Sequence, residues 1–130
     1  MPPNSRIPRR LLLQLCMAIW RNQPRSFTQD ARTCIGALKP PLKVYNPEFI
    51  PQTGPCLVTV NHYSRPGFRA WWFALGISAC VPCVVHWTVT SAWTYPDRLR
   101  SKTITPLTRW FLQKISDVYG FTTMPPMPRP

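Results

Sequence analysis

The chain has 130 residues, which is enough for one domain with a modest hydrophobic core and too few for two. Hydrophobic residues make up 45% of it, which excludes a chain that is disordered throughout, although 17 prolines are many for a compact domain. The net charge of +12 favours an anionic partner, such as a nucleic acid, an anionic membrane surface or a phosphorylated small molecule.

The N-terminal 41 residues are predicted to be a basic lead. Residues 11–20 form an apolar run about half as long as the roughly twenty residues of a membrane span. Arginines flank this run on both sides, at Arg9, Arg10, Arg21 and Arg25. The pattern predicts a helix, either one lying on an anionic membrane surface or an ordinary buried one. Residues 22–41 are polar and basic, and we predict no helix or strand there.

Residues 42–130 are predicted to form a partial domain, beginning with two strands. Residues 42–45 alternate like a short strand, and a turn at Asn46-Pro47 and a loop rich in Pro and Gly follow. Residues 56–60, Cys-Leu-Val-Thr-Val, form a continuous apolar run with β-branched residues. Such a run is typical of a strand that is buried on both faces.

Two further elements are expected around residues 70–89, a stretch without charged residues. Residues 68–79 predict a helix that Pro82 ends, and residues 83–90 predict a second buried strand containing His86. The stretch is long enough for a membrane span, but the change in residue type at Pro82 favours two separate elements. We interpret His86 as a hydrogen-bonded core histidine.

The last elements are an amphipathic helix at residues 106–119, ended by Gly120, and the start of a strand at residues 121–124. The basic residues before this helix (Arg98, Arg100 and Lys102) are expected in a solvated loop. The order strand, helix, strand, helix, strand predicts an α/β fold, a partial sheet with flanking helices. Because the chain ends where a strand begins, we expect it to be truncated.

The five cysteines are an odd number, and no small-residue cleavage site follows residues 11–20. We therefore predict no secretory signal, free thiols and a reducing, cytoplasmic setting. Cys80 and Cys83 have the spacing of redox and zinc motifs, but the expected helix precedes them and only His86 is a nearby further ligand. We interpret both as buried structural thiols and predict no metal site.

The candidate site is Asn61-His62, which the strand at residues 56–60 would bring to its carboxyl end, where ligands bind in open α/β sheets. Histidine suits proton abstraction near neutral pH. The helix after Pro66 would offer a free N-terminus to a phosphate or oxyanion. Arg65 and Arg69 flank the motif and are candidates for binding a substrate phosphate.

Over roughly residues 42–124 the chain resembles the glycerol-3-phosphate and 1-acylglycerol-3-phosphate acyltransferase family. The family motif begins with Asn-His, as at Asn61-His62-Tyr63-Ser64, and residues 46–51 and 54–60 resemble the segment that precedes it. The resemblance implies an acyltransferase-like fold in which His62 deprotonates a glycerolipid hydroxyl, which attacks acyl-CoA or an acyl carrier protein. Asn61 and His62 are thus the predicted catalytic residues, and Ser64, Arg65 and Arg69 the predicted substrate-binding residues.

The resemblance further implies a peripheral enzyme of phospholipid synthesis at the cytoplasmic face of an anionic membrane, with no cofactor besides the acyl thioester. The chain departs from the family at Gly67, where the motif has an aspartate. Loss of the carboxylate that orients the histidine of a serine-protease triad costs about 10⁴ in rate. Glu48 and Asp97 are candidate substitutes. The later family motifs, a glycine-arginine phosphate site and a Pro-Glu-Gly stretch, are not visible in the sequence.

Two hypotheses from other classes stay open. Six tryptophans and the net charge permit a small nucleic-acid-binding module, through base stacking and phosphate contact. However, aromatic residues such as Trp71-Trp72-Phe73 lie in apolar runs rather than among basic residues, so we predict no nucleic-acid partner. The other hypothesis is a catalytically inactive, membrane-associated fragment.

Overall fold

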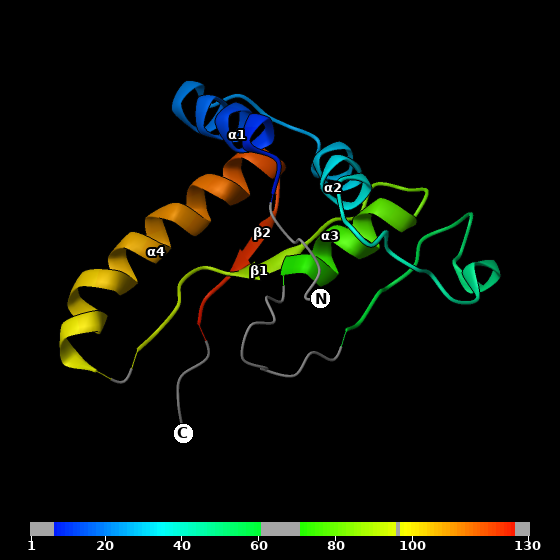
Figure 1. The fold of residues 1–130 in the computed structure, drawn as a ribbon. Coiled ribbons are helices and arrows are strands. Elements are labelled where there is room, and N and C mark those ends of the chain that lie inside the picture. Colours follow the sequence, from blue (N-terminus) through cyan, green and yellow to red (C-terminus); the bar gives the residue numbers. More distant parts are fainter. Residues whose placement is uncertain (1–6, 61–70, 96, 127–130) are drawn as a thin grey trace. The chain divides into compact units, whose positions relative to one another are not determined.

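The computed structural model describes residues 7–60, 71–95 and 97–126. Their elements, in chain order, are α1 (Arg9–Arg21), α2 (Phe27–Gly36), the 3-10 helix η1 (Pro47–Phe49), α3 (Trp71–Cys80), β1 (Thr88–Thr90), α4 (Arg98–Tyr119) and β2 (Thr122–Met124) (Figure 1). The chain divides into two compact units. The first comprises Met1–Leu12 and Ser26–Val85, and the second comprises Leu13–Arg25 and His86–Pro130.

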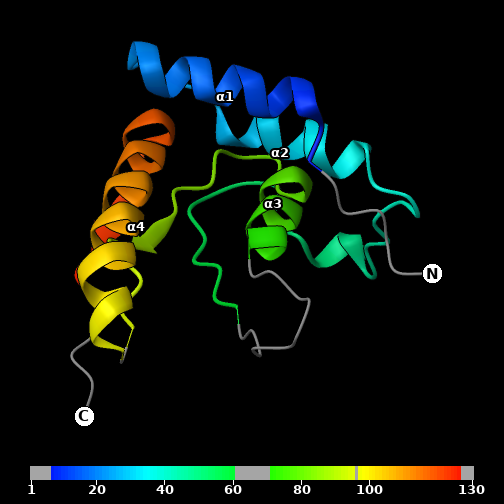
Figure 2. The ribbon, with the colours of Figure 1, turned by 60° about the vertical axis from the view of Figure 1, so that its left-hand side comes forward.

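The core of the first unit lies where α2 packs against α3, and Figure 2 shows these two helices side by side. Its buried residues are Leu11, Ala31, Cys34 and Leu75, and Phe27, Ile35, Trp72 and Ala79 pack against them. No helix was predicted at α2. The hydroxyl of Ser26 caps it by accepting a 3.3 Å hydrogen bond from the amide of Gln29. This cap and the helical spacing of Ala31, Cys34 and Ile35 are the signals that the prediction missed.

The two strands predicted in the first unit are absent. Residues 42–45 and 56–60 have no strand structure, and the predicted turn contains η1. Residues 56–59 are exposed, with Leu57 at 91% and Val58 at 42%. A strand is held by hydrogen bonds to its neighbours, and in the described part of the chain the sheet contains only β1 and β2. An apolar run without such a partner has no reason to become a strand.

The second unit contains a parallel strand pair joined by a helix, which confirms the broad α/β prediction. β1 and β2 pair with Val89 opposite Thr123, and α4 connects them (Figure 1). The pairing reaches one residue past each end of β1, through hydrogen bonds of 3.0 Å from the Thr122 amide to the Trp87 carbonyl and 2.8 Å from the Ser91 amide to the Met124 carbonyl. The strand predicted at residues 83–90 is thus reduced to its last three residues.

The helix predicted at residues 106–119 is much longer than expected. It begins after Asp97, whose Oδ2 accepts a 3.1 Å hydrogen bond from the amide of Arg100, and it ends at Gly120, which adopts a left-handed φ of 69°. Pro106 lies inside the helix, although proline is more often found in a first turn. The basic residues expected in a loop therefore lie in the first two turns of α4, which corrects that prediction.

The helix predicted in the basic lead is confirmed as α1. Leu11 and Ala18 are buried, whereas Leu13, Met17 and Trp20 are 66%, 50% and 82% exposed. Because these three residues are four and seven positions apart, they lie on one face of the helix. Across the described residues, no helix combines the length and the apolar character that crossing a membrane requires.

Candidate functional site

The predicted catalytic residues Asn61 and His62 and the predicted substrate-binding residues Ser64, Arg65 and Arg69 lie outside the described residues, as does Gly67. What the structure describes is the chain on both sides of this motif. Residues 56–60 precede it without forming the expected strand, and α3 follows it from Trp71. The expectation of a helix just after the motif is therefore confirmed, and that of a buried strand just before it is wrong.

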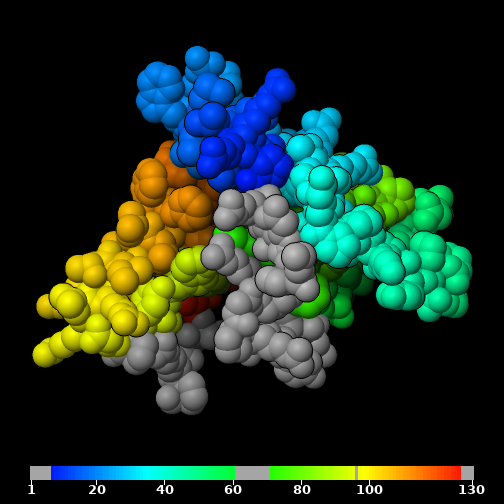
Figure 3. All heavy atoms as spheres, in the orientation of Figure 1, coloured from blue at the N-terminus to red at the C-terminus, as the bar shows by residue number. Residues whose placement is uncertain are grey.

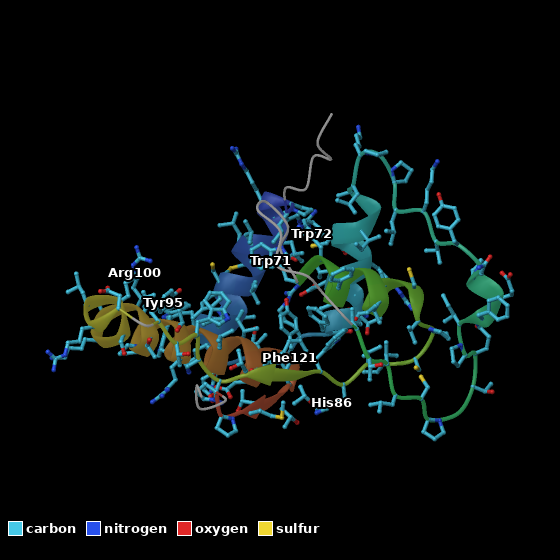
Figure 4. All side chains as sticks on the ribbon, turned by 90° about the horizontal axis from the view of Figure 1, so that it is seen from below. Trp71, Trp72, His86, Tyr95, Arg100 and Phe121 are labelled. Carbon is cyan, nitrogen blue, oxygen red and sulfur yellow. The ribbon has the colours of Figure 1, made fainter. Side chains whose placement is uncertain are left out.

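α3 is anchored by its packing on α2. Leu75 and Ser78 are buried, and Trp72 packs against the core of the first unit. Trp71 and Phe73 are 45% and 38% exposed, so they lie at the surface of the first unit. Figure 4 shows Trp71 and Trp72 at the start of this helix. The chain that leaves the motif thus enters a fixed helix pair, and α2, which sequence reasoning missed, is the element that holds it.

Two carboxylates were candidates to replace the missing aspartate, and one of them has a structural role. Asp97 caps α4 through its hydrogen bond with the Arg100 amide. If this carboxylate turned toward an imidazole, α4 would lose its cap, which costs about 0.5–2 kcal/mol. Glu48 is exposed in η1.

The thiol of Cys34 is buried at the centre of the first unit. Burial, with a further contribution from the negative charge of Asp30, raises the pKa of Cys34. The neutral form is therefore favoured at physiological pH, and the residue packs as a small apolar side chain. This environment is the opposite of the one that activates a nucleophilic cysteine.

The other four thiols are not joined in disulfide bonds. All five cysteines are free, and Cys80 is partly buried while Cys83 is exposed, so the prediction of two buried structural thiols is wrong for Cys83. The described residues contain no group of three or more His, Cys, Asp or Glu side chains that could hold a metal ion.

His86 lies just before β1 and forms a hydrogen bond with β2. Its Nε2 is 2.7 Å from Oγ1 of Thr122. The ring is hydrogen-bonded as predicted, but it is exposed and does not belong to a core. We therefore assign it a structural role in the strand pair.

No protein-family model, curated protein or solved structure matches the chain. The likeness to the glycerolipid acyltransferases is thus a prediction carried by the motif at Asn61-His62 and by the segments around it.

Proposed function

We propose that the chain transfers an acyl group from acyl-CoA or an acyl carrier protein to a hydroxyl of glycerol phosphate or lysophosphatidate. The observation that best supports this function is the order of elements after the Asn61-His62 motif. Helix α3, strand β1, connecting helix α4 and parallel strand β2 follow in turn, which is an order typical of α/β sheets.

In the proposed reaction the imidazole of His62 accepts the proton of the acceptor hydroxyl. The resulting alkoxide attacks the thioester carbonyl, the carbon–sulfur bond breaks, and the leaving thiolate takes the proton from the imidazolium. Asn61 acts beside His62, while Ser64, Arg65 and Arg69 bind the phosphate of the acceptor. The acyl thioester is a co-substrate, and the reaction needs no further cofactor.

The site of action that goes with this reaction is the cytoplasmic face of an anionic membrane, because the product is a membrane lipid. The exposed side chains of α1 support this location. Leu13, Met17 and Trp20 form an apolar face that is half or more exposed, and arginines stand at both ends of the helix. A helix of this kind lies in the plane of the lipid headgroups. These side chains favour the membrane-surface helix over a wholly buried one.

The test is an acyl transfer assay on the whole chain with labelled acyl-CoA and either acceptor. Replacing His62 by Ala should lower the rate by about 10²-fold or more, because general base catalysis contributes that much. His86→Ala is the matched control, since it removes the only other histidine, which bonds Thr122 at the surface. Equal rates for the wild type and His62→Ala would overturn the proposal. Absence of transfer by the wild type, together with membrane binding, would favour the inactive membrane-associated fragment.

A further inference from the structure

Among the described residues, helix α4 has one face with buried side chains and another face with exposed apolar side chains. Thr108, Ser116 and Val118 are buried. On another face, Leu99, Leu107 and Trp110 are 73%, 62% and 56% exposed. Because eight and eleven residues correspond to about two and three turns, these three side chains form one stripe along the helix. Figure 3 shows the yellow and orange side chains of α4 at the molecular surface.

Thr103 lies on the same stripe, one turn after Leu99. Its hydroxyl donates a 2.8 Å hydrogen bond to the carbonyl of Leu99. The hydroxyl proton is thus already hydrogen-bonded within the helix. The methyl group of Thr103 then extends the apolar stripe. We call Leu99, Thr103, Leu107 and Trp110 the outer face of α4.

Cations stand on both sides of the outer face. Arg100 flanks it on one side, and Lys102 and Arg109 on the other, by the spacing of an α-helix. These three side chains are exposed, and Arg100 points away from the ribbon in Figure 4. The sequence from Arg98 to Lys114 contains no Asp or Glu.

The position of these cations is unfavourable for the helix alone. The N-terminal end of a helix carries a partial positive charge, which is stabilised by acidic residues and not by basic ones. Asp97 caps this end, but the first turn itself has no acidic residue and contains Arg98 and Arg100. An anionic surface beside the helix would turn this repulsion into attraction.

We propose that the outer face of α4 docks in the plane of an anionic lipid bilayer. Leu99, Leu107 and Trp110 enter the boundary between headgroups and acyl chains, and the flanking cations contact the lipid phosphates. The inference deepens the membrane partner of the proposed function and rests on it, but it does not need catalysis by His62. α4 is then a second lipid-binding element, separate from the basic lead.

Other occupants fit this face less well. Self-association through the outer face would bring together the cations of two copies, which repel each other over about 10 Å at ordinary salt. A nucleic acid would satisfy the cations, but its phosphate backbone would leave the leucine side chains without an apolar partner. A bilayer meets both requirements, because its headgroups are charged and its interior is apolar.

The experiment measures binding of the whole chain to vesicles of phosphatidylcholine, alone or mixed with phosphatidylglycerol. The wild type should bind the mixed vesicles more tightly, and added salt should weaken this preference. The double substitution Leu107→Ser/Trp110→Ser should lower the partition constant by about tenfold, because binding scales with buried apolar area. Arg100→Gln/Lys102→Gln should lower it by on the order of tenfold on the mixed vesicles alone.

Matched controls remove exposed apolar and basic side chains that lie outside α4. Leu57→Ser/Phe49→Ser removes two side chains that are 91% and 79% exposed, and Arg32→Gln/Lys43→Gln removes two exposed cations. Circular dichroism checks that each variant keeps its helices.

The proposal is overturned if Leu107→Ser/Trp110→Ser, folded as the wild type, binds mixed vesicles equally well. It is also overturned if that substitution leaves vesicle binding intact and converts a dimer into a monomer, or if the chain binds duplex DNA and no vesicle. His62→Ala should bind vesicles like the wild type while it loses acyl transfer. A chain that binds through α4 but transfers no acyl group would therefore reject the proposed function and leave this inference standing.

Discussion

His86 and Thr122, which are 36 positions apart in the sequence, are joined by a side-chain hydrogen bond of 2.7 Å between Nε2 and Oγ1. The bond lies at the start of the parallel pair, since Thr122 is opposite Thr88 in the register. Each strand has only three residues, so contacts just outside the ladder make up a large part of the pairing. The histidine thus helps to fix which residues of the two segments face each other.

This bond should be measurable as a coupling energy. His86→Ala and Thr122→Val should each destabilise the chain, and the double variant should be less destabilised than the sum. The difference should be about 0.5–1.5 kcal/mol, the usual net contribution of one hydrogen bond. Urea unfolding of the four proteins gives this value. Full additivity of the two substitutions would show that the contact adds nothing.

The cap of α4 gives a second prediction. Asp97→Ala removes the acceptor of the Arg100 amide and should lower the free energy of unfolding by about 1 kcal/mol. Asp97→Asn keeps an acceptor oxygen and should cost much less. The measurement is urea denaturation followed by the helical circular dichroism signal. If both variants unfold at the wild-type urea concentration, the cap has no role in stability.

The elements that sequence reasoning found are those with strong local signals. α1 and the second half of α4 show apolar residues at helical spacing, and Gly120 marks the end of α4 at a left-handed φ that suits glycine. The first half of α4 was missed because Pro106 suggested a helix start. The cap at Asp97 was the better signal.

The strands could not be predicted with the same success, because strand formation depends on residues far away in the sequence. Residues 56–60 have the composition of a buried strand but are without strand structure, whereas the strand start predicted at residues 121–124 is confirmed as β2, which pairs with β1. The candidate site was therefore predicted from its motif alone. The helix pair that anchors the chain after the motif depends on a core shared by Ala31 and Leu75, which no local pattern could indicate.

Burial of Cys34 gives a prediction about reactivity. Because desolvation and Asp30 raise its pKa, the thiolate fraction at a given pH is lower than for an exposed thiol. Iodoacetamide should therefore label Cys83, which is exposed, faster than Cys34, as read by mass spectrometry of the digested chain. Labelling of both at one rate in the folded chain would contradict the structure.

The same raised pKa makes stability depend on pH in a defined direction. The folded state holds the proton of Cys34 more tightly than the unfolded state, so this contribution is complete below the ordinary thiol pKa. It is lost as pH rises from that value through the raised pKa of the folded chain. In Cys34→Ala the alkaline fall in stability should be smaller, and urea midpoints measured across the alkaline range test this. An unchanged pH profile in that variant would assign the fall to other groups.

Gly67 offers the sharpest test of the proposed reaction, because it stands where the motif of the acyltransferase family that the chain resembles has an aspartate. Gly67→Asp should raise the rate of acyl transfer, since a carboxylate beside His62 would fix the tautomer of its ring and stabilise the imidazolium. In a serine-protease triad the same carboxylate is worth about 10⁴ in rate, which sets an upper bound for the gain.

The matched variant is Gly67→Asn, which has nearly the same shape but no charge, and it should gain much less. The combination of Gly67→Asp with His62→Ala should be as slow as His62→Ala alone, because the carboxylate acts only through the imidazole. Steady-state acyl transfer with saturating acyl-CoA distinguishes these cases. If Gly67→Asp and Gly67→Asn change the rate equally, the carboxylate does not act on the histidine, and the proposed role of His62 as general base loses its support.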